Sequence, residues 1–149
     1  MYSKTPLQFH SKLYATYSAQ IFIKREDLQV VRSYKIRGAY NLIQSLNPEE
    51  RNRGVVCASA GNHAQGVAFS CKLLHIHGVI YMPEVTPKQK INQVKMFGGD
   101  WIEIVLVGDT FDECQFVALE YAEANKKYSF RLLIISKLWR GKGLLAKKF

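Results

Sequence analysis

Short apolar segments alternate along this chain with longer segments of helical periodicity. Their composition and length predict strands at residues 21–24, 54–58, 79–82 and 102–107. The helical segments lie at residues 36–46, 62–74, 87–97 and about 110–125. Strands that alternate with helices of this length predict βαβ units with right-handed crossovers. We therefore expect an α/β fold, an open and mostly parallel Rossmann-like sheet with flanking helices.

Several helix ends carry recognisable signals. Thr86 followed by Pro87 predicts an N-cap and a proline at the first helical position. The pair at residues 98–99, Gly-Gly, predicts the end of that helix. Asp109 or Thr110 is expected to cap the last helix.

Ligands of open parallel sheets bind at the carboxyl ends of the strands, where loops enter helices. This rule points to residues 59–63 and to the segment after Lys24. The small-residue turn at 59–62 precedes a helix, where backbone N–H groups favour a phosphate or carboxylate. Lys35 lies where the helix at 36–46 begins, a position at which the helix dipole favours a neutral, nucleophilic amine. Each feature alone is also compatible with ordinary turn geometry or a surface lysine.

The distribution of charge argues against a nucleic-acid-binding protein. The net charge is +9, but eight of the 21 Lys and Arg residues lie in residues 126–149, which contain no acidic residue. Residues 1–125 therefore carry 13 basic against 12 acidic residues, and no basic stripe runs along them. No apolar run approaches the roughly 20 residues of a membrane span, and residues 1–7 lack a signal-peptide pattern. We expect a cytoplasmic protein that binds neither nucleic acid nor membrane.

The cysteines and the paired histidines do not form a metal-ligand pattern. Cys57, Cys71 and Cys114 are too widely spaced for a zinc unit and are expected to be small buried or half-buried thiols rather than reactive ones. His75 and His77 follow a helix and are expected at the surface. We predict no metal site.

Two long motifs occur in order at the predicted site. The first comprises KREDLQ at residues 24–29 and SYKIRGAYN at 33–41, and the second is ASAGNHAQGVA at 58–68. Together they resemble the cofactor-lysine segment and the substrate-carboxylate loop of the serine/threonine dehydratases, pyridoxal-phosphate enzymes of the tryptophan-synthase-β-like fold. The resemblance continues, in order, through YMP at 81–83, TP at 86–87, Lys90, FGG at 97–99 and GDTFD at 108–112. It covers roughly residues 5–125 and is closest to the threonine dehydratases (threonine ammonia-lyases) of isoleucine biosynthesis.

The resemblance implies roles at the cofactor, pyridoxal 5'-phosphate. Lys35 would bind it covalently and then act as the base that removes the substrate α-proton. Asn62 would hydrogen-bond the 3-oxygen of its ring. Tyr34 would pack against the ring, at a position where many members of the family have Phe.

The resemblance also implies a substrate pocket for an amino acid. Ser59, Gly61, Asn62 and His63 would bind its carboxylate, largely through backbone N–H groups, although His63 is equally compatible with a helix-start residue held by local hydrogen bonds. The implied reaction converts L-threonine into 2-oxobutanoate and ammonia. Arg37 and Gln65 are interpreted as structural residues.

The family pattern divides the chain in two. Residues 1–125 correspond to the N-terminal part of the catalytic domain, mainly its smaller subdomain, and residues 126–149 form a basic tail outside the pattern. The glycine-rich loop that holds the cofactor phosphate is expected beyond residue 149, so we expect this chain alone to be inactive. Intact members of the family are expected to be homo-oligomers.

Two alternative functions remain. One is a non-catalytic peripheral membrane-binding or interaction protein that uses the amphipathic tail. The other is a relative of serine racemase or serine dehydratase.

We predict a shift of reading frame near residues 128–130. Read from the third base of each codon, residues 131–134 can encode Pro-Phe-Asp and residues 138–145 can encode Met-Glu-Gly-Gln-Gly-Thr-Val, which resemble the family's continuation. Sequencing the gene from codon 120 onward and translating all three frames tests this prediction. If neither motif is encoded in any of the three frames beyond codon 128, the prediction is wrong.

Overall fold

Four parallel strands form the centre of the computed structural model, which describes residues 3–130. They are β3 (Val55–Ala58), β4 (Gly78–Met82), β5 (Ile102–Leu106) and β6 (Tyr128–Phe130). Their order in the sheet is β5-β4-β3-β6, and every neighbouring pair is parallel. The predicted α/β class and the open parallel sheet are therefore confirmed.

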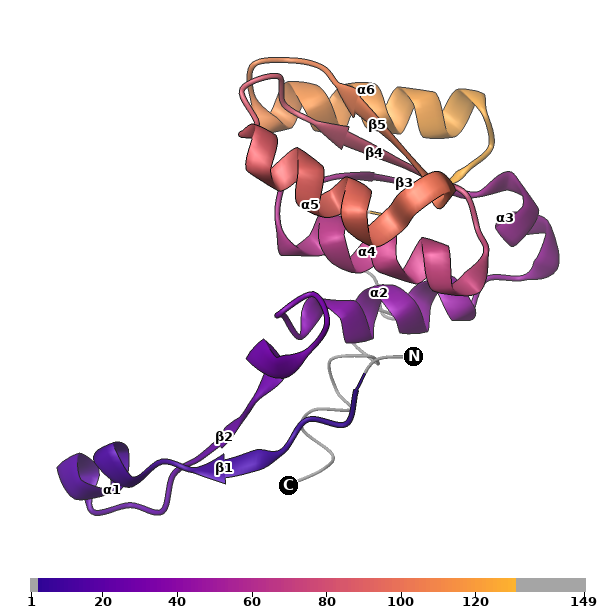
Figure 1. Ribbon diagram of the computed structural model, residues 1–149. Helices are drawn as coiled ribbons and strands as arrows, with labels where there is room; N and C mark the ends of the chain where they lie inside the picture. The colour runs from indigo at the N-terminus through magenta and orange to yellow at the C-terminus, as the bar shows by residue number, and fades with distance from the viewer. Residues whose placement is uncertain (1–2, 131–149) are drawn as a thin grey trace.

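Helices cover both faces of this sheet (Figure 1). α6 (Phe111–Ala124) lies against one face, and α4 (Asn62–Leu74) and α5 (Lys88–Gly98) lie against the other. α2 (Lys35–Gln44) packs on the outer side of α4. Eight of the 13 residues of α4 are buried because this helix is enclosed between the sheet and α2. Its apolar and small residues, Ala64, Val67, Ala68 and Cys71, follow the predicted helical spacing.

The inner strands are buried along their whole length. Every residue of β3 and β4 is buried, which explains why their sequences are continuous apolar runs rather than alternating ones. Side chains of β3 alternate between the two faces: Val55 and Cys57 belong to the core under α4 and α2, and Val56 and Ala58 belong to the core under α6.

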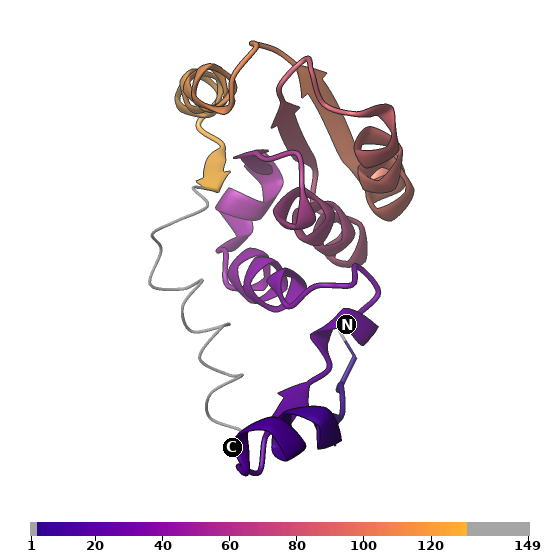
Figure 2. The ribbon, with the colours of Figure 1, turned by 90° about the vertical axis from the view of Figure 1, so that its left-hand side faces the viewer.

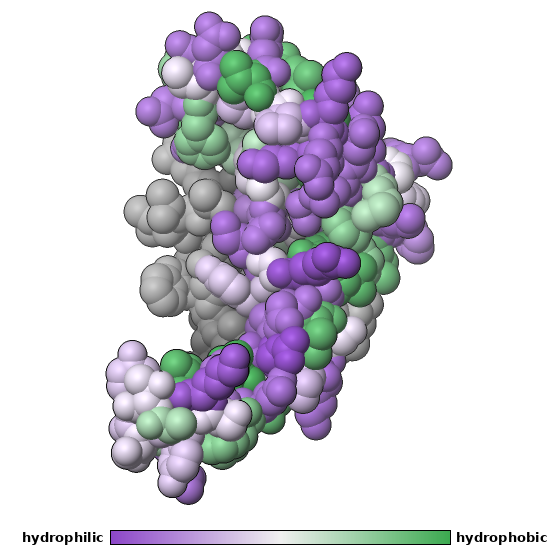
Figure 3. All heavy atoms as spheres, turned by 60° about the vertical axis from the view of Figure 1, so that its left-hand side comes forward, coloured by the Kyte–Doolittle hydropathy of each residue, from purple (hydrophilic) through white to green (hydrophobic). Residues whose placement is uncertain are grey.

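An N-terminal ribbon extends away from the layered body (Figures 1 and 2). It consists of β1 (Leu7–Phe9), α1 (Ser11–Tyr17) and β2 (Phe22–Lys24), with β1 antiparallel to β2. α1 has no buried residue. Figure 3 shows a mixed surface at this end of the molecule, with scattered apolar atoms among polar ones. The large apolar residues exposed on the ribbon are Leu7, Phe9, Tyr14, Tyr17, Phe22 and Ile23.

Two sequence expectations need correction. The strand at 21–24 exists, but it pairs with β1, so the segment after Lys24 does not lie at the carboxyl edge of the parallel sheet. Thr86 is not the N-cap of α5: the cap is Pro87, whose carbonyl accepts from Lys90 N at 2.9 Å. Thr110, in contrast, does cap α6 and forms a capping box with Glu113.

Short elements were not predicted from the sequence. They are β1, α1, β6, α3 (Pro48–Arg53) and the 3-10 turns η1 (Glu26–Leu28) and η2 (Gly99–Trp101). The start of α3 had a readable signal, because Asn47 and Glu50 form a capping box with Pro48 at the first position. The predicted division at residue 125 stays a prediction. Beyond that position the structure describes β6, which begins at Tyr128 and pairs with β3. The frameshift and the amphipathic tail concern residues 131–149 and lie outside the described residues. Within residues 3–130 no helix is long and apolar enough to cross a membrane.

A buried ion pair joins η1, which follows the ribbon, to α2. The guanidinium of Arg37 donates to both carboxylate oxygens of Glu26, each at 2.7 Å, and the side chains are 5% and 11% exposed. Thr5 Oγ1 and Gln29 Nε2 also donate to this carboxylate. Gln29 in turn exchanges two hydrogen bonds with the backbone of Ser3. We call Ser3, Thr5, Glu26, Gln29 and Arg37 the buried polar network.

The carboxylate of Glu26 should make stability depend on pH. Burial alone would raise its pKa, but hydrogen bonds from Arg37, Thr5 and Gln29 and the charge of Arg37 outweigh burial, so its pKa lies below the ordinary 4.5. The stabilisation is therefore complete above the unfolded-state pKa and is lost as pH falls through the folded-state pKa. We expect the free energy of unfolding, measured with urea, to fall as pH drops below 4.5. Glu26→Gln should flatten this pH dependence and destabilise the fold by about 3–5 kcal/mol, because Arg37 would stay buried without its partner.

Glu49→Gln is the matched control. Glu49 pairs with Arg53 at the surface, with a side chain that is 77% exposed. An exposed pair contributes only about 0.2–1 kcal/mol, so this variant should keep the acid sensitivity of the parent chain. Equal effects of the two substitutions would contradict a special role of the buried polar network.

Candidate functional site

α2 and α4 are in close contact at Gly66. A Cβ atom on Gly66 would lie 3.3 Å from the backbone N and Cα of Ile36 and the carbonyl carbon of Lys35. The absence of a side chain therefore allows the start of α2 to rest directly on α4. Asn62 is four residues before Gly66 and so lies on the same face of α4, one turn nearer its N-terminus. This contact brings the first turns of α2 and α4, with Lys35 and Asn62, to one side of the molecule.

The loop between β3 and α4 is held by short-range hydrogen bonds. Ser59 is 7% exposed, and its backbone N donates to the Tyr81 carbonyl at 3.0 Å, which continues the β3–β4 pairing by one residue. Its hydroxyl accepts from the N of Gly61 at 3.4 Å. The loop is thereby fixed at the carboxyl end of β3, as the sequence predicted.

Gly61 leaves open space beside this loop. It is the N-cap of α4, and a Cβ atom built on it meets no other protein atom within 4 Å. Its φ of −132° lies outside the left-handed region, so other residues could adopt this backbone conformation. The first N–H groups of a helix lack intrahelical acceptors and favour an anion. A glycine cap supplies no side chain that would compete with that anion, so the loop has the shape and polarity of a carboxylate site.

Lys35 and Tyr34 begin α2. Tyr34 is its N-cap and is 40% exposed, and Lys35, its first residue, is half-buried. The backbone N of Lys35 donates to the hydroxyl of Ser33 at 3.3 Å. Arg37, two residues later, ties this first turn to the buried polar network. A half-buried amine on a fixed helix start can form a covalent bond with a small carbonyl compound.

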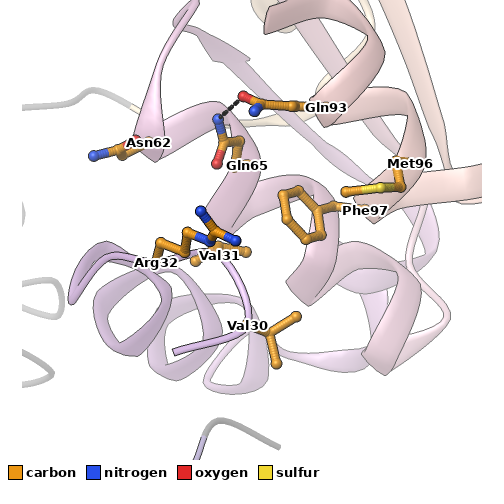
Figure 4. Close-up of a pocket in the computed structure, with 8 residues that line it drawn as sticks. All are labelled: Val30, Val31, Arg32, Asn62, Gln65, Gln93, Met96 and Phe97. Carbon is orange, nitrogen blue, oxygen red and sulfur yellow. Dashed lines mark hydrogen bonds between the residues drawn. The ribbon is translucent and has the colours of Figure 1, made fainter. Parts of the chain in front are cut away.

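A cleft of about 390 Å³ adjoins Asn62 (Figure 4). It lies among α4, α5 and the segment before α2. Its lining residues are Val30, Val31, Arg32, Asn62, Gln65, Gln93, Met96 and Phe97. Across it, Gln65 Nε2 donates to Gln93 Oε1 at 3.0 Å. The interpretation of Gln65 as a structural residue is consistent with this bond, which connects α4 to α5.

The cysteines are buried thiols, as predicted. Cys57, Cys71 and Cys114 are free and buried. Burial raises the pKa of all three, that of Cys71 to about 12. Such thiols are almost entirely protonated at neutral pH and are poor nucleophiles.

The two histidines lie at the surface, also as predicted. His75 and His77 are exposed, and their rings lie 5.0 and 5.1 Å from the ring of Trp101. Within the described residues, no group of three or more His, Cys, Asp or Glu side chains could hold a metal ion.

The predicted site residues lie at the starts of two helices, α4 and α2. Ser59, Gly61, Asn62 and His63 follow β3 directly, and His63 is 2% exposed within the first turn of α4. Tyr34 and Lys35 join them through the α2–α4 contact. Sequence reasoning did not find Arg32 and Gln93, which line the adjoining cleft. Arg32 and Gln93 border the same cleft because of the left-handed backbone of Arg32 and the packing of α5. No spacing in the sequence indicates either residue.

Comparison with known proteins shows which proteins this chain is similar to. The family model described as "Pyridoxal-phosphate dependent enzyme" matches residues 1–135. The chain is 58% identical over 123 residues to the biosynthetic L-threonine dehydratase IlvA of Staphylococcus epidermidis, covering 83% of this chain and 29% of that protein. It is 52% identical over 142 residues to the IlvA of Bacillus subtilis, covering 95% of this chain and 34% of that protein.

Solved structures show the same fold. The processed form of threonine deaminase isoform 2 from Solanum lycopersicum superposes with a TM-score of 0.92 at 41% identity, over 99% of this chain and 42% of that one. Maize serine racemase superposes with a TM-score of 0.90 at 28% identity, over 99% and 44% of the two chains. The chain thus spans about a third of the length of these curated relatives and less than half of these solved chains.

Substitutions at the two glycines should separate packing from binding. Gly66→Val places a branched side chain against the backbone of α2, so we expect a loss of about 1–3 kcal/mol in the free energy of unfolding. Gly61→Ser adds a favoured N-cap side chain in open space and should leave stability unchanged or slightly higher. Urea denaturation of both variants tests this. A stable Gly66→Val protein would show that α2 is free to move away from α4.

Proposed function

This chain belongs to the family of pyridoxal-phosphate-dependent enzymes, and we propose that it is the part of an L-threonine dehydratase that supplies the cofactor lysine and the substrate-carboxylate loop. The complete enzyme would convert L-threonine into 2-oxobutanoate and ammonia for isoleucine biosynthesis in the cytoplasm. The observation that supports the proposal is the contact at Gly66, at which the first turn of α2 rests on α4, one turn after Asn62. The identity to biosynthetic threonine dehydratases supports the choice of substrate.

The cofactor side of the site uses Lys35, Asn62 and Tyr34. When bound, pyridoxal 5'-phosphate supplies a carbonyl for covalent attachment and a ring that accepts electrons from the substrate α-carbon. Lys35 would hold the cofactor covalently through its amine and would serve as the base for the substrate α-proton. The Asn62 amide, at the exposed start of α4, would hold the ring's 3-oxygen, and the exposed ring of Tyr34 would pack on the cofactor.

The substrate side uses the loop after β3. Ser59, Gly61, Asn62 and His63 would hold the carboxylate at the N-terminus of α4, mainly through backbone N–H groups. The bonds from Ser59 to Tyr81 and Gly61 fix this loop before substrate arrives. A carboxylate held there restrains rotation of the substrate and aligns its α-hydrogen with the Lys35 amine. Loss of the α-proton and of the β-hydroxyl, together one water, would leave an enamine. Addition of water to its imine tautomer would release 2-oxobutanoate and ammonia.

Catalysis would need residues in addition to those of this chain. We propose that the groups that bind the cofactor phosphate and face the ring nitrogen lie in the additional length of the relatives, and that the complete protein is a homo-oligomer. The 149-residue chain alone would then bind the cofactor weakly and turn over little or no threonine. Serine racemase is the second candidate, favoured by the TM-score of 0.90 to the maize enzyme.

A chimaera can test the function directly. Residues 1–125 would replace the matching segment of the Bacillus subtilis relative, and formation of 2-oxobutanoate from L-threonine would be measured. We expect turnover, and we expect Lys35→Ala to lower kcat by at least about 10³-fold because the base and the covalent attachment are both lost. The visible absorbance of the lysine-bound cofactor should disappear with it.

Two controls make this test specific. Gly61→Ser should keep the absorbance of the bound cofactor but raise KM for threonine strongly, because its side chain fills the carboxylate site. D-serine formed from L-serine faster than 2-oxobutanoate from L-threonine would favour the racemase instead. A Lys35→Ala chimaera with normal turnover would show that another lysine serves the reaction.

A further inference from the structure

The helix of the N-terminal ribbon, α1, begins at an imidazole cap. His10 is its N-cap, and the Nδ1 atom of His10 accepts a hydrogen bond from the backbone N–H of Leu13 at 3.2 Å. The backbone N of His10 also donates to the carbonyl of Ile21 at 2.9 Å, which ties the cap to the segment that enters β2. N-caps are usually Ser, Thr, Asp or Asn, which accept through oxygen. An imidazole nitrogen, in contrast, accepts only while the ring is neutral.

An aromatic contact accompanies this cap. Phe9 directly precedes the cap residue, and Tyr14 is the fourth residue of α1. Their ring centroids are 5.6 Å apart, which is the arrangement of a hydrophobic staple. The ring of Phe9 also lies 5.5 Å from that of Phe22 in β2. The cap and the staple together therefore hold the start of α1 on the β1–β2 pair.

α1 has few other supports within the described part of the chain. It lies at the far end of the ribbon, away from the parallel sheet (Figure 1), and none of its residues is buried. It has only seven residues, and isolated helices shorter than about 12–15 residues are marginal in water. Its order therefore depends strongly on the interactions at its first turn.

The charges around the cap would not offset a positive charge on His10. Residues 7–24 contain no Asp or Glu, and the charged side chains of this segment are Lys12 in α1 and Lys24 in β2. The two tyrosines of α1 are neutral near pH 7. After β2, the carboxylate of Asp27 is paired with Arg25. The helix dipole disfavours a cation at an N-terminus. A protonated His10 would therefore lose its role as an acceptor and also meet an unfavourable field.

We propose that His10 is a pH switch of the N-terminal ribbon: protonation of its imidazole removes the cap and releases α1 from the β1–β2 pair. With the proton on Nε2, the neutral ring accepts from Leu13, whereas the imidazolium has no acceptor. α1 is therefore ordered above the titration range of His10 and unwound below it. Imidazoles change charge between pH 5 and 8, whereas the pKa of Glu26 lies below 4.5, so the buried polar network is unaffected in this range. The switch does not depend on the proposed function, since no proposed site residue lies in the ribbon.

NMR of the labelled 149-residue chain between pH 8 and pH 5 tests the proposal. The Cα and carbonyl chemical shifts of residues 11–17 report the helix, and the Cε1–H signal of His10 reports its protonation. We expect the helix–coil equilibrium constant of α1 to fall roughly tenfold, because the loss of the cap and the unfavourable charge act together. The midpoint should coincide with that of the His10 ring. A helix that persists while this ring titrates would overturn the proposal.

Variants assign the transition to the imidazole of His10. His10→Asn supplies a cap oxygen that accepts at every pH, so the helical shifts of residues 11–17 should persist at pH 5. His10→Ala has no acceptor, so α1 should already be weakened at pH 8 and respond little to acid. His75→Asn is the matched control: it removes an exposed imidazole far from the ribbon, keeps a residue that tolerates the φ of 54°, and should respond like the parent chain. If His10→Asn unwinds on acidification as the parent does, another group causes the transition and the proposal is wrong.

Discussion

The contact between α2 and α4 at Gly66 is the constraint on which the arrangement of the site depends. Lys35 and Asn62 are 27 positions apart in the sequence and belong to different helices. They share one side of the molecule because a glycine lets backbone meet backbone at the start of α2. β3 then sets the position of α4 itself, since the loop from Ser59 to Asn62 is short and pinned to β4 through Tyr81. The start of α2 is therefore positioned on α4 by backbone packing, whereas the loop is held to the sheet by a hydrogen bond.

The buried polar network fixes the other side of the same region. Glu26 and Arg37 are costly to bury, and their bidentate pairing with support from Thr5 and Gln29 offsets that cost. This pairing joins the N-terminal segment, the turn before Lys35 and the first turns of α2. It also holds Gln29, whose carbonyl closes the turn that strains Arg32. The network thus fixes the first turn of α2, which begins with the proposed cofactor lysine.

The N-terminal ribbon and the cap of α5 are features that the sequence pattern could not predict. A three-residue strand such as β2 carries too few residues to reveal its partner, so its place outside the parallel sheet could not be read from the sequence. α1 has no buried residue and hence no apolar face to mark it. The cap of α5 shifted from Thr86 to Pro87 because Thr86 is buried in a turn, where its N donates to the Pro83 carbonyl.

The sequence by itself determined the parallel α/β architecture, the bounds of α4 and the residue types at both halves of the site. Local signals suffice for these features, because a buried strand needs a continuous apolar run and a capped helix needs particular residues at its ends. Only the tertiary structure decided that the start of α2 rests on α4 at Gly66, that β2 lies outside the parallel sheet, and that Arg32 and Gln93 border one cleft. Those relations depend on distances between elements far apart in the chain, and no local periodicity encodes such distances.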